Sequence, residues 1–192
     1  MKTRTAFGLG CLTGGLAAPV ALFLIFLVIA IVFKDQIVAM RSKQLETPRA
    51  VSGLDADYGW SIFDLEGNAV ALDTWKDKAL FLHFWHPECY ECLPELPGIA
   101  ALYAQSKDAA QFMLVGTGEA EDIRTEAAKY GLEGVAFRLE GELPPVFAST
   151  SVPRTYIIAP GGEIVLRHVG SANWGAPELE ALVKAAGALG PK

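Results

Sequence analysis

The sequence predicts an α/β domain whose mixed sheet carries helices on both faces, preceded by an apolar N-terminal segment. Apolar runs with the length of strands alternate with helical stretches in the order βαβαβ and then ββα, which is typical of a mixed sheet. Glycine turns stand at 66–68 and 160–162, each between two strand-like runs. The 192 residues carry a formal net charge of −6, and this acidity argues against a general nucleic-acid binder.

The N-terminal segment has the composition of a membrane helix. No charged residue occurs between Thr5 and Phe33, and residues 16–33 are exclusively Leu, Ala, Pro, Val, Phe and Ile. A bilayer core of ~30 Å needs ~20 apolar residues in a helix, whereas the apolar region of a cleaved signal peptide spans ~7–15. We therefore expect a transmembrane anchor at 14–33 after a cytoplasmic segment at 1–13, with a cleaved signal peptide as the alternative.

The rest of the chain divides into a stalk and a folded domain. Thr47-Pro48-Arg49 and Ser52-Gly53 break any helix that continues from the anchor. Residues 34–56 are therefore expected to form a juxtamembrane linker, and residues 57–192 the domain. Lysine and arginine occur on both sides of the apolar run, so their distribution does not decide the orientation of the anchor.

The strands and helices of the domain are predicted in order along the chain. Trp60–Leu65 and Ala69–Leu72 have the pattern of a hairpin around a glycine turn. Ala79–Trp85 is almost continuously apolar, as a buried parallel strand is. The remaining expected elements are a helix that ends near Lys107, strands at 111–116 and 135–139, a helix at 119–130, a second hairpin from 154–159 and 163–169, and a final helix at 177–186.

Two cysteines follow the apolar strand in the pattern Cys89-Tyr90-Glu91-Cys92. At the start of a helix this spacing puts both sulfur atoms on one side, close enough to form a disulfide. The first sulfur then lies at the helix N-terminus, where free N–H groups stabilise a thiolate. The pattern suits a dithiol that cycles with a disulfide. The sequence has no second pair of cysteines, which removes the commonest kind of zinc site.

The motifs around these cysteines resemble those of the membrane-anchored TlpA-like thiol–disulfide reductases of bacteria. That group belongs to the thioredoxin superfamily and includes cytochrome c maturation reductases. The resemblance covers roughly residues 55–190 and implies a thioredoxin fold and a disulfide reductase activity. The matching motifs are Phe84-Trp85, Cys89-x-x-Cys92-x-x-Glu95-x-Pro97, Val152-Pro153-Arg154-Thr155 and Gly161-Gly162-Glu163-Ile164 before His168-Val169-Gly170.

The resemblance implies a role for each cysteine and for the residues beside them. Cys89 is expected to be the attacking thiol and Cys92 the resolving thiol, joined in a redox disulfide. Pro153 is expected to follow a cis peptide bond, so that the backbone of Val152 is offered to a bound partner. Val152, Pro153 and Trp85 are therefore expected to contact the substrate. No cofactor beyond the redox disulfide is expected.

Two further residues have alternative interpretations. Glu95 matches an active-site carboxylate in the resemblance, but a residue at this position can also be a solvated helix residue. His83 lies inside the apolar strand, where it is either a core histidine bonded to the backbone or a proton acceptor for Cys92. Pro97 is expected to kink the helix that follows the cysteines.

The regular spacing of His83, His86, Cys89 and Cys92 also fits a metal site, because thiolate and imidazole suit copper or zinc. The alternative function is therefore a copper-binding or copper-delivery module that uses Cys89, Cys92 and a histidine. A strand that runs through Trp85 should turn His83 away from the helix of the cysteines. We therefore expect no metal.

The charges around the dithiol predict its redox behaviour. Glu88, Glu91 and Glu95 lie within seven residues of one another, and negative charges disfavour a nearby thiolate. A strong oxidant of this superfamily is one whose reduced form is stabilised. Three carboxylates beside Cys89 therefore predict a reducing couple.

The compartment follows from the anchor and the dithiol together. A tethered dithiol is useful on the oxidising side of a membrane, where disulfides form. We expect an inner-membrane protein with one membrane span and a periplasmic domain. Its expected partners are a disulfide-bearing protein substrate, a membrane reductant as electron donor and the lipid bilayer, with no nucleic acid.

Overall fold

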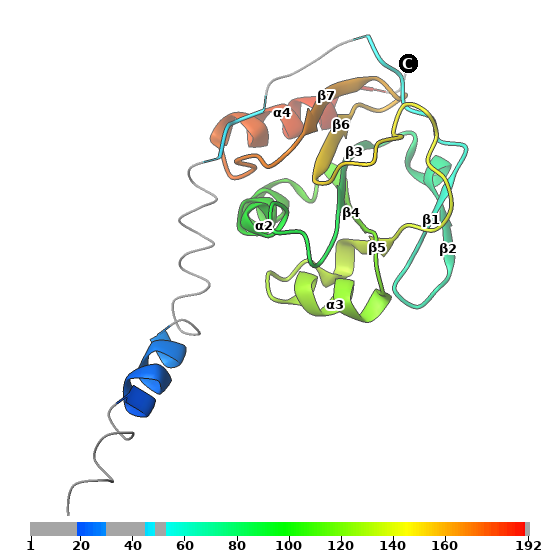
Figure 1. The fold of residues 1–192 in the computed structure, drawn as a ribbon. Helices are drawn as coiled ribbons and strands as arrows, with labels where there is room; N and C mark the ends of the chain where they lie inside the picture. Colours follow the sequence, from blue (N-terminus) through cyan, green and yellow to red (C-terminus); the bar gives the residue numbers. More distant parts are fainter. Residues whose placement is uncertain (1–18, 30–44, 49–52, 191–192) are drawn as a thin grey trace, which may run out of the picture. The chain divides into compact units, whose positions relative to one another are not determined.

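The computed structural model describes residues 19–29, 45–48 and 53–190, which fall into two separate units (Figure 1). Residues 19–29 form a helix with exposed side chains. Within the described ranges, no helix has both the length and the apolar character that a membrane span requires. Residues 14–18 and 30–33 of the predicted anchor, the segment at 1–13 and much of the linker at 34–56 lie outside the described residues.

A seven-stranded mixed sheet organises residues 53–190, in the order β2-β1-β5-β4-β3-β6-β7. Strand β3 lies inside the sheet, parallel to β4 on one side and antiparallel to β6 on the other. Both predicted hairpins are confirmed, because β1 pairs with β2 and β6 pairs with β7. The strands are β1 (Ser61–Phe63), β2 (Ala69–Ala71), β3 (Ala79–Trp85), β4 (Ala110–Gly116), β5 (Ala136–Arg138), β6 (Arg154–Ile158) and β7 (Ile164–Val169).

The helices of this unit lie on one face of the sheet, so the prediction of helices on both faces is wrong. They are α2 (Leu96–Ser106), α3 (Ala120–Ala128) and α4 (Pro177–Ala188). The connections β3-α2-β4 and β4-α3-β5 step across the sheet in the same direction. Because such crossovers are right-handed, both place their helix on the same face. Buried side chains of all three helices join one core cluster, namely Leu96, Ile99 and Leu102, Ile123 and Ala127, and Leu179, Val183 and Ala186.

The opposite face is covered by irregular segments. Phe147 of the loop at 139–153 is fully buried there, and Trp60 of the N-terminal hairpin packs against it. The side chains of β3 alternate between the two faces, so Phe84 belongs to this second cluster. Phe81 and Trp85 belong to the cluster under the helices. His83 lies between them in register and therefore faces the helices.

The cysteines precede the helix instead of starting it. Cys92 is followed by a 3₁₀ turn, η2 (Leu93–Glu95), and α2 begins at Leu96. Pro97 therefore stands in the first turn of α2, where a proline is tolerated because its missing N–H would have no helical acceptor. The predicted kink inside the helix is wrong for the same reason.

Candidate redox site

Cys89 and Cys92 form a disulfide in the turn between β3 and α2, with their Cα atoms 5.2 Å apart. The two cysteines differ in exposure, since Cys89 is half-buried and Cys92 is fully buried. The backbone N–H of Cys92 donates to the Sγ atom of Cys89 at 3.1 Å. A donor at this sulfur stabilises a thiolate there when the disulfide is reduced. The geometry thus distinguishes an accessible sulfur from a shielded one.

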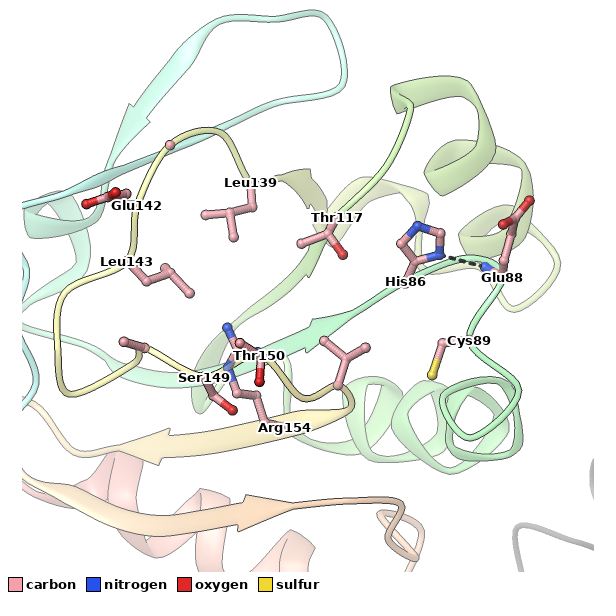
Figure 2. A pocket seen from close by; sticks show the side chains of 13 residues that line it. His86, Glu88, Cys89, Thr117, Leu139, Glu142, Leu143, Ser149, Thr150 and Arg154 are labelled. Atoms are coloured by element: carbon pink, nitrogen blue, oxygen red, sulfur yellow. Dashed lines mark hydrogen bonds between the residues drawn. The ribbon is translucent and has the colours of Figure 1, made fainter.

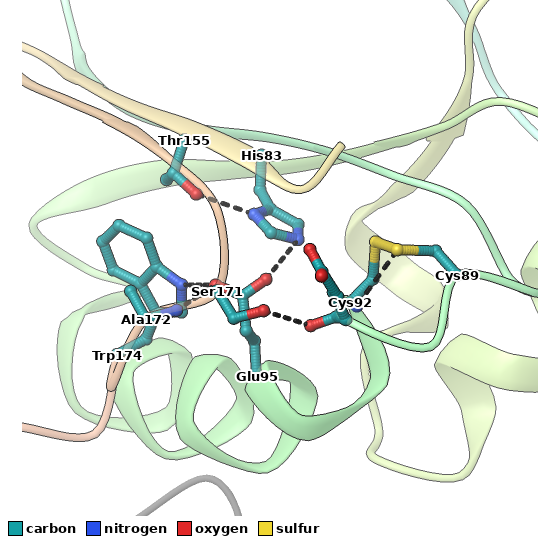
Figure 3. Close-up of polar contacts among 9 residues, drawn as sticks. His83, Cys89, Cys92, Glu95, Thr155, Ser171, Ala172 and Trp174 are labelled. Carbon is teal, nitrogen blue, oxygen red and sulfur yellow. Dashed lines mark hydrogen bonds and ion pairs between the residues drawn. A yellow bond between two sulfur atoms is a disulfide. The ribbon is translucent and has the colours of Figure 1, made fainter. Parts of the chain in front are cut away.

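Glu95 is fully buried beneath the disulfide turn (Figure 3). Its Oε1 atom accepts the indole N–H of Trp174 at 2.6 Å and the backbone N–H of Ala172 at 2.8 Å. Burial raises the pKa of Glu95 to about 8, and the hydrogen bonds from Trp174 and Ala172 lower it only in part. The interpretation of Glu95 as a solvated helix residue is therefore wrong. Its carboxyl group is a buried acid that titrates near neutral pH.

His83 faces Glu95 from β3, so the expectation that the strand turns it away from the cysteine turn is wrong (Figure 3). Its Nδ1 atom hydrogen-bonds the hydroxyl of Thr155 at 2.8 Å. The partner of this core histidine is thus a side chain on the neighbouring strand β6, and not the backbone. Burial, together with the positive charge of Arg154, lowers the pKa of His83 to about 3.

The two buried groups form a pair in which both side chains are uncharged at neutral pH. The Nε2 atom of His83 lies 4.0 Å from Oε2 of Glu95. Burial favours the neutral form of each group, so His83 is an uncharged imidazole and Glu95 a protonated carboxyl. The contact is therefore not an ion pair, because His83 stays uncharged throughout the pH range in which Glu95 ionises. Of the two, Glu95 is the group that changes charge close to neutral pH.

The peptide bond between Val152 and Pro153 is cis, as the resemblance implies. Pro153 is buried at the start of β6, and Val152 is half-buried beside it. Val152 lines a cavity of about 920 Å³ together with Cys89 (Figure 2). The predicted partner-binding residue and the accessible sulfur thus share one cavity.

This cavity is bounded by the cysteine turn on one side and by the loop at 139–153 on the other (Figure 2). His86 lies at its rim, where its Nδ1 atom accepts the backbone N–H of Glu88 at 3.0 Å. Trp85 does not line the cavity, because its side chain is fully buried under the helices. The predicted contact of Trp85 with substrate does not fit this burial.

Solved structures with the same arrangement of strands and helices exist. The thioredoxin domain of a thiol-disulfide oxidoreductase from Bacteroides vulgatus aligns with a TM-score of 0.55 and 22% identity, covering 69% of this chain and 98% of that chain. A thiol:disulfide interchange protein of the thioredoxin family from Chlorobium tepidum TLS aligns with a TM-score of 0.55 and 18% identity, covering 74% and 97%. The domain has a thioredoxin-like fold.

Curated proteins named thiol-disulfide oxidoreductase ResA match part of the chain. The protein from Bacillus thuringiensis subsp. konkukian (strain 97-27) is 27% identical over 107 residues, which is 54% of this chain and 62% of the relative. The protein from Halalkalibacterium halodurans is 30% identical over 110 residues, which is 56% of this chain and 62% of the relative. The matches thus span about three fifths of these relatives. No family profile matches the chain.

The site of the thioredoxin-like domain also uses residues to which the sequence assigned no role. Ala172 and Trp174 hold Glu95 from the segment between β7 and α4. Thr155, which belongs to the cis-proline motif but had no expected role, holds His83. The indole of Trp174 lies 79 residues from Glu95 in the chain, so no local spacing connects them. Across the described ranges, no three His, Cys, Asp or Glu side chains are grouped to hold a metal ion.

Proposed function

We propose that this chain is a membrane-tethered thiol–disulfide oxidoreductase that reduces disulfides of extracytoplasmic proteins through Cys89 and Cys92. One observation carries the proposal: a redox disulfide joins an accessible sulfur to a shielded one, next to a buried acid that titrates near neutral pH. The named activity of the ResA relatives supports it. The thioredoxin-like fold and the cavity beside Cys89 are consistent with a disulfide-bearing substrate.

The first step starts from the reduced protein. The thiolate of Cys89 attacks one sulfur of the substrate disulfide, and the substrate S–S bond breaks as the mixed disulfide forms. The second substrate sulfur leaves as a thiolate and takes up a proton from solvent. The N–H of Cys92 supports the Cys89 thiolate before the attack, because it points at that sulfur.

The second step releases the substrate. Cys92 loses its proton, and its sulfur attacks Sγ of Cys89, so that the Cys89–Cys92 disulfide forms and the substrate leaves as a dithiol after protonation. Two electrons and two protons reach the substrate in total. The ionised carboxylate of Glu95 is suited to accept the proton of Cys92, because its pKa of about 8 lies near that of a thiol, ~8.5. A membrane dithiol reductant then returns two electrons to the disulfide.

The tether and the compartment belong to the same proposal. The described helix at residues 19–29 exposes apolar side chains along its length, among them Leu22, Phe23 and Phe26. It lies within the uncharged run between Thr5 and Phe33, which has the composition of a membrane anchor. We propose that the thioredoxin-like domain lies on the periplasmic side of the inner membrane, because a tethered dithiol is useful on the side where disulfides form. Such a reductase would serve the maturation of cytochrome c or of other metalloproteins, whose disulfides it would reduce.

The test is turnover of a protein disulfide by the full chain in detergent, with a dithiol as the electron source and insulin as the substrate. We expect Cys89→Ser to abolish reduction and Cys92→Ser to accumulate a mixed disulfide, which mass spectrometry identifies. Cys11→Ser is the matched cysteine control and should retain full activity. Reduction that persists in Cys89→Ser would refute the proposal.

A further inference from the structure

A buried cation lines the cavity beside Cys89. Arg154 begins β6, directly after the cis proline, and only 3% of its surface is exposed. Its guanidinium lies against the ring of Phe84, with Cζ 4.3 Å from the ring centroid, and one nitrogen donates to the backbone carbonyl of Ser151 at 2.8 Å. Figure 2 shows this side chain among those that line the cavity, beside Ser149 and Thr150. The cation is thus fixed in position by packing.

The charge of Arg154 is not neutralised by an acidic side chain in the described part of the chain. No carboxylate pairs with it there, and its Nε atom is buried without a hydrogen-bond partner among the same residues. Burial lowers the pKa of Arg154, while the neighbouring Tyr156 raises it. An arginine nevertheless keeps its proton at neutral pH, because its ordinary pKa is so high. A buried guanidinium without an anionic partner is costly, and an arriving anion removes that cost.

The surroundings of Arg154 favour a small, singly charged anion. Glu88 and Glu142 also line the cavity, and both are exposed at its rim. Two carboxylates on the lining of the same cavity disfavour a multiply charged group such as a phosphate ester. A carboxylate carries one charge, and it fits the planar fork of the guanidinium with two parallel hydrogen bonds.

We propose that Arg154 binds a carboxylate that the substrate carries close to its disulfide, so that this protein prefers acidic disulfide substrates. The inference rests on the proposed function, because Cys89, which would attack that disulfide, lines the same cavity. The carboxylate belongs either to an Asp or Glu side chain of a protein substrate or to a small disulfide such as glutathione disulfide. Arg154 is in this view a specificity residue for the substrate.

The test compares substrates that differ only in this charge. The probes are two peptides with one internal disulfide, identical except for Asp or Asn beside a cysteine, and glutathione disulfide as the small-molecule arm. The full chain with Cys11→Ser, reduced and in detergent, is mixed with each probe, and the rate constant for reduction is measured. The variants are Arg154→Gln, Arg154→Lys and, as a charge-matched control on the exposed face of β7, Arg167→Gln.

We expect reduction of the Asp peptide to be at least about tenfold faster than that of the Asn peptide. This is the difference in rate that one charge-assisted hydrogen bond provides. Arg154→Gln should abolish this preference, Arg154→Lys should keep part of it and Arg167→Gln should keep all of it. If the two peptides react at equal rates but Arg154→Gln slows the reduction of glutathione disulfide, the result also supports the carboxylate site and assigns it to small disulfides. Equal rates for the two peptides and no effect of Arg154→Gln on any probe would overturn the inference. An equal loss on both peptides would overturn it too, since Arg154 would then act on the fold or the potential.

A binding measurement separates this inference from the proposed function. The same peptides with both cysteines replaced by serine are titrated against the oxidised full chain, and fluorescence anisotropy reports binding without any redox step. Tighter binding of the Asp peptide that Arg154→Gln removes supports the site even if the chain reduces no probe. Equal affinities for both peptides, with normal turnover, would overturn the inference and leave the reductase proposal standing.

Discussion

The Oε2 atom of Glu95 lies 4.0 Å from Nε2 of His83, and within the described residues neither atom has a hydrogen-bond partner. Both side chains are fully buried, and each is anchored through its other polar atom, Glu95 by Trp174 and Ala172 and His83 by Thr155. The two free atoms therefore face each other in a site from which water is excluded. Burial shifts the two pKa values in opposite directions, and each shift has its own consequence for stability.

Replacing Glu95 by Gln should remove a loss of stability that develops between pH 4.5 and about 8. The pKa of Glu95 rises from 4.5 to about 8 on folding, so between these pH values the folded chain holds a proton that the unfolded chain has released. The free energy of unfolding therefore falls as pH rises through this window, by at most about 1.4 kcal/mol per pH unit. Denaturant titrations of wild type and Glu95→Gln, followed by tryptophan fluorescence, should diverge steadily from pH 5 to pH 8. Parallel curves would show that Glu95 is ionised in the folded protein.

Replacing His83 should remove the opposite dependence at acidic pH. The pKa of His83 falls from 6.5 to about 3 on folding, so the unfolded chain binds a proton that the folded chain excludes. The stability that this group contributes is present above pH 6.5 and is lost as pH falls toward 3. His83→Asn should flatten this acid limb, while Glu88→Gln, at an exposed residue, should follow wild type. An acid limb that His83→Asn leaves unchanged would contradict the assignment.

The two cysteines should differ in their reaction with iodoacetamide. In the reduced full chain with Cys11→Ser, we expect fast alkylation of half-buried Cys89 and slow alkylation of fully buried Cys92. The N–H donor at Cys89 adds to the difference because the thiolate is the reactive form. Peptide mass spectrometry over a time course gives both rates. Faster labelling of Cys92 would reverse the proposed roles of attacker and resolver.

Replacing Gly98 by Ala should disturb the segment that holds Glu95. A Cβ atom at Gly98 would stand 2.9 Å from the backbone nitrogen of Gly175, beside Trp174. Because backbone cannot yield as a flexible side chain can, α2 must move away from this segment, at a cost of about 1–3 kcal/mol. Gly134→Ala, where a Cβ meets nothing within 4 Å, is the matched control. Equal denaturation midpoints for the two variants would contradict the close packing.

The redox potential should lie closer to the value of thioredoxin, ~−270 mV, than to that of a strong oxidant, ~−120 mV. The structure changes the reason for this expectation, because Glu95 is protonated at neutral pH and only exposed Glu88 and Glu91 remain charged. Exposed charges act weakly, so Glu88→Gln and Glu91→Gln should each raise the potential by only about 10–20 mV. Equilibration with glutathione measures it, with Glu121→Gln on α3 as control. A potential near the oxidant value would contradict the proposed direction of electron flow.

The features that the sequence predicted correctly are those that local patterns of residues determine. β3 has the predicted bounds because every residue of Ala79–Trp85 is buried, which gives an apolar run with sharp ends. The cysteine spacing indicated the disulfide for an equally local reason. Periodicity does not indicate which face of the sheet a helix covers, and that depends on the order of the strands.

The environment of Glu95 was beyond local patterns. A single carboxylate between two prolines, at 94 and 97, has the composition of a solvated turn. Its burial depends on Ala172 and Trp174, which arrive from a distant segment and replace water as hydrogen-bond donors. The position of Arg154 was also beyond local patterns, because its place in the cavity depends on the loop at 139–153 folding over β6.

The alternation of side chains along β6 separates two tasks between consecutive residues. Arg154 lies over Phe84 on the loop-covered face, and Thr155 bonds His83 on the helix-covered face. A substitution at the first position changes the contacts of the cavity, and a substitution at the second changes the hydrogen bond of the buried pair. Substrate preference and proton chemistry are therefore separated in space but still coupled through charge, since the positive charge of Arg154 lowers the pKa of His83 on the other face of the sheet.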